Sequence, residues 1–242
     1  APMVIENLLG RDVIYSIYQP DAQNILKVEA NGRLPVGSRE YFYTLDIFAG
    51  VFMGVVFDDS WTCAQPAAIY SQNSEHQTKL PIVNRFRETT FIHFDYSSNS
   101  SLGAHHRVTL YSPYWLVNYT SKNLILKESS GRILTHAVSH NQESSPMMFS
   151  FTREKDYKIA LRVDDSSYSD YFRVDNIGVS DYFMVKGNLD TNYCIGFSVM
   201  LAPGKFNRTK IVVLSSRYMF HNRTPHDVYL KRAHSTEQPI VI

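Results

Sequence analysis

Three short apolar segments of this chain end in an asparagine, at Asn7, Asn118 and Asn222, which lie 111 and 104 positions apart. Five residues after each asparagine stands another Asp or Asn, namely Asp12, Asn123 and Asp227, followed by an aliphatic residue. A fixed period of this kind is typical of proteins built from repeated structural units. We therefore predict repeats of about 105 residues, each opening with a strand, a turn and a second strand.

Two further pairs of similar segments keep nearly the same period. Residues 56–60 match residues 162–166 at an offset of 106, and residues 91–94 match residues 194–197 at an offset of 103. The matches predict a first β repeat over 1–110 and a second over 111–214. Residues 215–242 are then either the opening hairpin of a third repeat or the closing strands of the second.

The periodicity of the apolar residues predicts strands throughout. Segments such as 40–47, 89–96 and 193–200 are short and rich in β-branched and aromatic residues, and turn formers separate them. No stretch of a dozen residues keeps a helical apolar period. The predicted fold is all-β, with tandem repeated β-sandwich-like modules arranged as an array.

Composition narrows the class of partner. The formal net charge is +1, so no long-range field draws the chain to nucleic acid or to an anionic membrane surface. No run of 18 apolar residues predicts a membrane span. The two cysteines, Cys63 and Cys194, are too far apart in sequence for a small secreted disulfide framework, which favours the cytoplasm. An extracellular carbohydrate-binding or adhesion array stays open because four Asn-x-Ser/Thr sequons occur, at Asn99, Asn118, Asn207 and Asn222.

Motifs for catalysis or metal binding are weak. No Gly-x-Ser-x-Gly elbow, phosphate-cradling loop or Cys/His nucleophile arrangement is present, so no enzyme is predicted. His136 and His140 have a four-residue spacing that places ligands together only on a helix. The Asp-Asp-Ser triplets at 58–60 and 164–166 are ordinary turn chemistry. We expect no catalytic residue, metal or cofactor.

The recurring asparagine has two interpretations. An Asn side chain can bond to the backbone two residues onward, and it would then only tie down the hairpin after the first strand. Alternatively, its amide faces outward and pairs with the N–H and C=O of a peptide added to a sheet edge. The nearby aromatic residues, Tyr114, Trp115, Tyr119 and Tyr218, would then form pockets for proline, or else belong to the core.

The openings of the repeats carry a family resemblance. The phrases at 112–118 (Ser-Pro-Tyr-Trp-Leu-Val-Asn) and 6–13 (Glu-Asn-Leu-Leu-Gly-Arg-Asp-Val) resemble repeat openings in the adaptor-binding domain of the vacuolar protein sorting thirteen family of bridge-like lipid-transfer proteins. The resemblance covers essentially the whole chain. It implies neighbouring β-rich repeats, each with one asparagine that maps onto Asn7, Asn118 or Asn222.

The resemblance also implies a function. The chain would capture short Pro-x-Pro motifs of organelle adaptor proteins and so recruit a lipid-transfer protein to membrane contact sites, with membrane association indirect and peripheral. The implied peptide-binding residues are Asn118, Asn222, Tyr114, Trp115 and Tyr218; Asn7 is the equivalent asparagine of an opening that lacks the aromatic pair. The alternative is a purely structural spacer with no ligand of its own.

Overall fold

The structure is a computed structural model, and it describes residues 3–57, 61–70, 78–99, 105–136, 146–153, 155–187, 192–218, 220, 222–231, 233, 236 and 238–241. In this part of the chain nearly every regular element is a strand. Two short 3₁₀ turns, η1 (Ile47–Ala49) and η2 (Gly204–Phe206), are the helical elements there. The predicted all-β class is confirmed.

The first ten strands form one sheet, in the order β3-β2-β5-β6-β8-β9-β10-β1-β4, with β7 paired to β5. We call them the first strand group. Their bounds are β1 (Met3–Leu8), β2 (Val13–Pro20), β3 (Leu26–Leu34), β4 (Arg39–Phe42), β5 (Val51–Phe57), β6 (Trp61–Cys63), β7 (Ala67–Tyr70), β8 (Lys79–Asn84), β9 (Thr89–Asn99) and β10 (His105–Tyr111).

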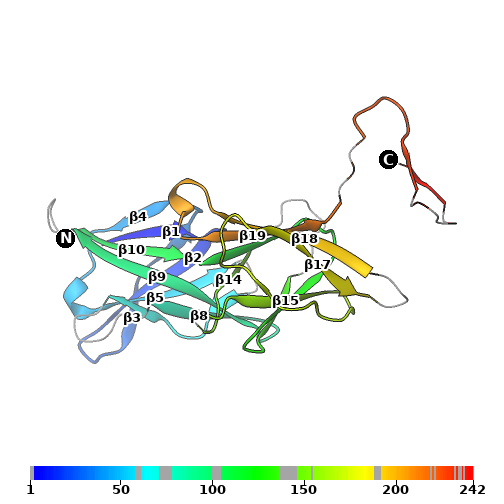
Figure 1. Ribbon diagram of the computed structural model, residues 1–242. Helices are drawn as coiled ribbons and strands as arrows, with labels where there is room; N and C mark the ends of the chain where they lie inside the picture. The colour runs from blue at the N-terminus through cyan, green and yellow to red at the C-terminus, as the bar shows by residue number, and fades with distance from the viewer. Residues whose placement is uncertain are drawn as a thin grey trace.

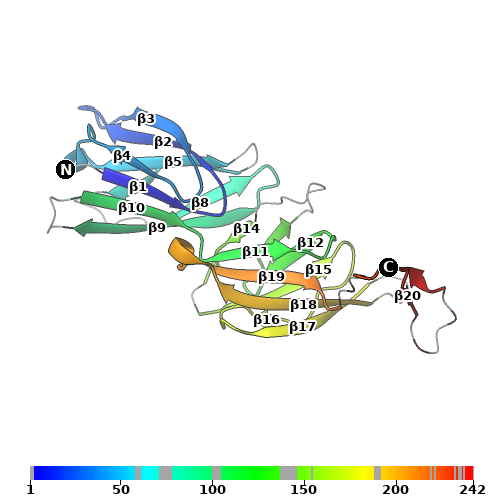
Figure 2. The same ribbon diagram turned by 90° about the horizontal axis from the view of Figure 1, so that it is seen from above.

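The next nine strands form two sheets, with the orders β14-β11-β19-β18-β17 and β13-β12-β15-β16. We call them the second strand group. Their bounds are β11 (Tyr114–Asn118), β12 (Leu124–Glu128), β13 (Ile133–His136), β14 (Met147–Phe149), β15 (Lys158–Val163), β16 (Phe172–Arg173), β17 (Ser180–Lys186), β18 (Asn192–Leu201) and β19 (Lys210–Ser216). Figures 1 and 2 show the two groups side by side along the molecule.

The two groups pair their opening strands in the same way. β1 runs parallel to β10 and antiparallel to β4, with Asn7 opposite Leu110. β11 runs parallel to β19 and antiparallel to β14, with Asn118 opposite Leu214. The two asparagines therefore occupy corresponding places in their sheets. The division at about 110 and 214, and the wider array of repeats, stay predictions.

Each group has its own apolar core, and side chains from the second group also enter the core of the first. The alternating burial of β2 and β12 shows one face of each strand turned inward. Trp115, Met148 and Ala202 of the second group pack into the first core, beside Phe206 and Ile211. The two groups thus share an apolar contact as well as a chain connection.

The segment 217–222, predicted from its likeness to the other two openings as a strand, is described only in part. β19 ends at Ser216, and the described residues of that segment, Arg217, Tyr218, Phe220 and Asn222, are outside any strand. A strand needs a partner for its N–H and C=O groups, and β1 and β11 each have one on both sides. After Ser216 the described pairing is between β20 (Tyr229–Leu230) and β21 (Ile240–Val241), in the segment that projects from the molecule in Figure 1.

Candidate functional site

Asn7 closes a small loop at the end of β1. Its Oδ1 accepts a hydrogen bond from the Leu9 N–H at 2.9 Å, and its Nδ2 donates to the Arg11 carbonyl at 3.0 Å. The same Nδ2 also donates to the carbonyl of Leu34, at 2.9 Å, in the last residue of β3. The residue is fully buried. The three hydrogen bonds of the Asn7 amide described above all join it to backbone groups of the chain.

Asn118 closes the corresponding loop at the end of β11. Its Oδ1 accepts from the Thr120 N–H at 2.9 Å and from the Thr120 hydroxyl at 2.6 Å. Its Nδ2 donates to the Lys122 carbonyl at 2.7 Å. The side chain is half-buried. Among the described residues, no carbonyl from a distant strand accepts a hydrogen bond from Asn118 as the Leu34 carbonyl does from Asn7.

Asn222 makes the same loop, and the described residues before it, Arg217, Tyr218 and Phe220, lie outside any strand. Its Oδ1 accepts from the Thr224 N–H at 2.9 Å, and its Nδ2 donates to the His226 carbonyl at 2.6 Å. The three asparagines thus share one local geometry, in which Oδ1 binds residue i+2 and Nδ2 binds residue i+4. These contacts are the ones expected if each asparagine ties down the turn that follows it.

Tyr114 and Trp115 point to opposite faces of β11, as neighbouring residues of a strand do. Tyr114 belongs to the second core, where its ring stacks on Phe149 at 5.0 Å. Trp115 packs into the first core, 5.4 Å from the Phe206 ring. Both side chains are less than a tenth exposed, so the two rings do not form one pocket.

Tyr218 is the exposed member of the predicted set. Its ring is 65% exposed and lies 5.0 Å from the guanidinium carbon of Arg217. The same guanidinium lies 3.4 Å from the ring centroid of Tyr182, on β17. Arg217 therefore links the start of the C-terminal segment to the edge strand of the five-stranded sheet through contacts with two aromatic rings.

A surface groove of about 350 Å³ lies beside this arginine. We call it the Gly196 groove, after the glycine in the middle of β18 that lines it. Its lining consists of Ser180, Asp181, Tyr182, Gly196, Phe197, Ser198, Ser215, Ser216 and Arg217. The predicted residue Asn118 stands in the same cross-sheet row, because Asn118 is opposite Leu214, which is opposite Phe197, which is opposite Asp181.

The groove residues were not predicted from the sequence. The available signal was Gly196 itself, because a glycine inside a strand often marks a place where another chain or ligand approaches the backbone. The contact between Arg217 and Tyr182 gives no sequence signal, since it depends on the pairing of three strands.

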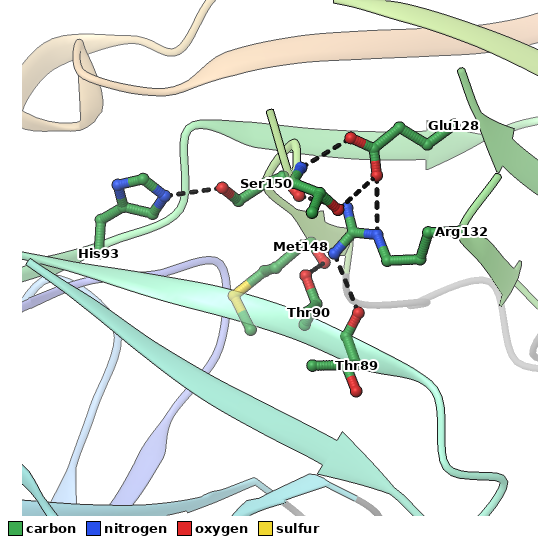
Figure 3. A network of polar contacts seen from close by, with 8 residues as sticks. Thr89, Thr90, His93, Glu128, Arg132, Met148 and Ser150 are labelled. Carbon is green, nitrogen blue, oxygen red and sulfur yellow. Dashed lines mark hydrogen bonds and ion pairs between the residues drawn. The ribbon is translucent and has the colours of Figure 1, made fainter. Parts of the chain in front are cut away.

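A buried polar network joins the two strand groups (Figure 3). Arg132 donates through Nε to Glu128 at 2.9 Å and through Nη1 to the carbonyl of Thr89, on β9, at 3.0 Å. Glu128, which is 1% exposed, also accepts from the Thr152 N–H at 2.7 Å. Burial is the largest effect on Arg132 and lowers its pKa, while Glu128 opposes that shift. The bond from Arg132 to Thr89 links this buried pair to the first strand group.

Metal and membrane signals are weak in the described chain. Within the described ranges, no three His, Cys, Asp or Glu side chains lie close enough together to bind a metal ion. His140 and the triplet at 58–60 lie outside those ranges. Asp164 and Asp165 lie in a turn that the Ser166 hydroxyl closes by accepting from the Val163 N–H at 2.8 Å. None of the described helices has the length and apolar character of a membrane span.

Comparison with known proteins places the chain in a family. Its residues 1–241 match the family described as vacuolar-sorting associated protein 13, adaptor binding domain. Among similar proteins are the intermembrane lipid transfer protein VPS13 of Chaetomium thermophilum, 25% identical over 98% of this chain, and Vps13D of Drosophila melanogaster, 23% identical over 92%. VPS13A of Mus musculus is 31% identical over 57% of the chain.

The chain spans less than a tenth of the length of these relatives, 8% of the first and 6% of the second. The family match covers almost every residue of the chain. The chain belongs to the adaptor binding domain family of vacuolar-sorting associated protein 13.

Proposed function

We propose that this chain binds a short Pro-x-Pro motif of an adaptor protein along the edge strand β17, with the proline side chains directed toward the adjoining Gly196 groove. The observation that carries the proposal is the juxtaposition of a sheet edge with a groove flanked by an aromatic ring. β17 is the last strand of its sheet, and Ser167 donates to the carbonyl of Lys186 at its end, so the outer edge before Lys186 offers N–H and C=O groups to an added strand.

The spacing of the two prolines suits a sheet edge. Alternate residues of an added strand direct their N–H and C=O groups to the neighbouring strand. When the middle residue of Pro-x-Pro bonds to β17, the backbone nitrogen of each proline points away from β17. The missing N–H groups of the prolines therefore cost no hydrogen bond. Their rings are then free to pack against Tyr182 and Tyr218, which are 45% and 65% exposed.

Asn118 supports this site by holding its loop. Its amide already bonds to Lys122 and Thr120, so in this proposal it fixes the end of β11, next to Leu214 and the row that leads to the groove. Asn222 does the same for the segment after Tyr218. Tyr114 and Trp115, buried on opposite sides of β11, hold that strand in its sheet.

In the intact protein, we propose, the captured adaptor recruits a lipid-transfer protein to membrane contact sites in the cytoplasm. The support is the family itself and its relatives, which are named intermembrane lipid transfer proteins. Membrane association through this chain is then indirect and peripheral, through the adaptor.

The test is calorimetry with a Pro-x-Pro peptide and a peptide in which alanine replaces both prolines. Gly196→Val places a side chain in the groove, and its Cβ meets neighbours no closer than 3.7 Å, which is ordinary van der Waals contact. We expect Gly196→Val and Tyr182→Ala each to weaken binding at least tenfold, the size of an aromatic interface contact. Tyr171→Ala, at a ring of matched exposure outside the groove, is the control.

The spacer alternative makes a different prediction. If the repeats bind no peptide, both peptides give no heat, and Asn118→Ala changes only the melting temperature. Equal binding of the two peptides, or unchanged affinity in Gly196→Val and Tyr182→Ala, would also overturn the proposed site.

A further inference from the structure

A second cavity lies where the two strand groups meet, about 360 Å³ in volume. We call it the junction pocket. It lies away from the Gly196 groove and shares no lining residue with it. Its walls come from both strand groups: Lys79, His93, Tyr111, Pro113, Tyr114, Ser150, Phe151, Arg153, Tyr157, Arg208 and Lys210.

The described lining carries four cations and no carboxylate: Lys79, Arg153, Arg208 and Lys210. Two acidic residues stand close behind it. Asp95 pairs with Arg208, and Asp175 accepts Lys210 Nζ through its backbone carbonyl at 2.9 Å. The Asp175 carboxylate is engaged by Arg173 at 2.7 Å. Among the described lining residues, four cations therefore stand against no carboxylate, in a chain whose net charge is +1.

Lys210 and Arg208 are held against aromatic rings. Lys210 Nζ lies 5.6 Å from the Tyr114 ring centroid and 5.9 Å from that of Tyr157, and the Arg208 guanidinium lies 5.6 Å from that of Tyr111. These contacts position the cations at the cavity with limited freedom, so less conformational entropy is lost when they bind a ligand.

His93 adds a polar group but no charge. Its Nε2 is 2.7 Å from the hydroxyl of Ser150, a residue 2% exposed. Burial, and to a lesser extent Lys79, lowers the pKa of His93 to about 4. The ring is neutral near pH 7, so the positive charge of the pocket comes from lysine and arginine alone and does not change between pH 6 and 8.

We propose that the junction pocket binds the phosphoryl group of a phosphorylated serine or threonine in a partner peptide. A phosphoryl group carries close to two negative charges and three strong acceptor oxygens, which match several converging cations. Pro113 and the rings of Tyr111 and Tyr157 supply apolar wall for the residue beside it. A cavity of this size accommodates a phosphorylated side chain and one neighbour.

A peptide fits better than a lipid headgroup. A membrane ligand needs exposed apolar side chains around the pocket that enter the bilayer interface. None of the large exposed hydrophobic residues in the described chain, such as Phe48 and Phe86, lines this pocket. The proposal does not depend on the Gly196 groove, since the two cavities are separate.

The experiment is a calorimetric and NMR titration of the whole chain with three probes: inorganic phosphate, a phosphoserine peptide, and the same peptide unphosphorylated. We expect saturable binding of the first two, with amide shifts at Pro113-flanking residues and at Ser150. Lys210→Gln and Arg153→Gln should each weaken phosphopeptide binding about tenfold, as for the loss of one charged hydrogen bond. Arg153 is exposed, so its variant folds even if Lys210→Gln does not.

Lys186→Gln is the control, because it removes the same charge from an exposed site outside the pocket. Equal weakening in Lys186→Gln would mean diffuse electrostatic attraction and would overturn the proposal. Equal affinity for the unphosphorylated peptide would do so too. The last probe is vesicles of phosphatidylcholine, alone and with an anionic phospholipid. Binding to the anionic vesicles without binding of the phosphopeptide would overturn the proposal and show that the ligand is a membrane. A Gly196→Val chain should bind the phosphopeptide normally.

Discussion

The Nδ2 of Asn7 lies 2.9 Å from the carbonyl oxygen of Leu34, and no described contact of this kind exists for Asn118. The contact joins the end of β1 to the end of β3, 27 residues along the chain. Asn7 therefore makes a tertiary contact in addition to closing its own loop. The two equivalent asparagines therefore differ in what they stabilise.

Asn7→Ala should cost more stability than Asn118→Ala. Removal of the buried amide leaves the Leu9 N–H and the carbonyls of Arg11 and Leu34 without their partner, whereas water can replace the half-buried Asn118. We expect losses of about 3 kcal/mol and about 1 kcal/mol in the free energy of unfolding. Urea denaturation of both variants measures the difference, and equal losses would contradict it.

Arg132→Met should destabilise the junction of the two groups. The buried Glu128 carboxylate would lose its counter-ion, a change that typically costs about 3 kcal/mol or more. The matched control is Arg33→Met, because Arg33 pairs with Asp12 at an exposed site and such pairs are worth about 0–1 kcal/mol. Denaturant unfolding of both variants is the measurement. Similar losses in the two variants would show that the network contributes little.

Acid should destabilise the fold partly through His93. Its pKa is lowered to about 4 in the folded state and is about 6.5 in the unfolded chain, so the unfolded state binds more protons between these values. His93 therefore does not lower the free energy of unfolding above pH 6.5, and it lowers this free energy progressively as the pH falls toward 4. We expect about 2 kcal/mol, allowing for the partly exposed ring.

The check for His93 is urea denaturation at pH 7 and pH 4.5. The His93→Asn variant should lose less stability on acidification than the parent chain. His226→Asn, at an exposed histidine, is the control for the substitution itself. A His93→Asn variant with an unchanged pH dependence would assign the acid sensitivity to other groups.

Gly10→Ala should also destabilise the contact between the groups. A Cβ at Gly10 would lie 2.7 Å from Pro146 Cγ and 3.2 Å from Trp115 Cε2. Both neighbours are stiff rings, and such overpacking costs about 1–3 kcal/mol. Pro146→Ala removes the closest clash, so the double variant should recover part of the loss in thermal unfolding. An unchanged melting temperature in Gly10→Ala would contradict tight packing at this contact.

Much of the fold could be predicted from local patterns. Short strands rich in β-branched and aromatic residues, separated by turn formers, gave the all-β class, and the spacing of Asn7 and Asn118 located two equivalent strand ends. The described residues of 217–222 lie outside any strand, and a sequence pattern does not show whether a pairing partner is present. The proposed groove was missed for a similar reason. Arg217 and Tyr182 are distant in sequence and meet only after β17, β18 and β19 pair.

The sequence alone determined the class of fold, the places of the asparagine loops and the family resemblance, because each depends on short-range chemistry that repeats along the chain. The tertiary structure decided that Tyr114 and Trp115 serve different cores, and that Asn7 is fully enclosed. It also decided that four cations from distant segments line one cavity. These facts depend on which surfaces the two strand groups bury against each other, and burial is a property of the packed molecule that no local segment contains.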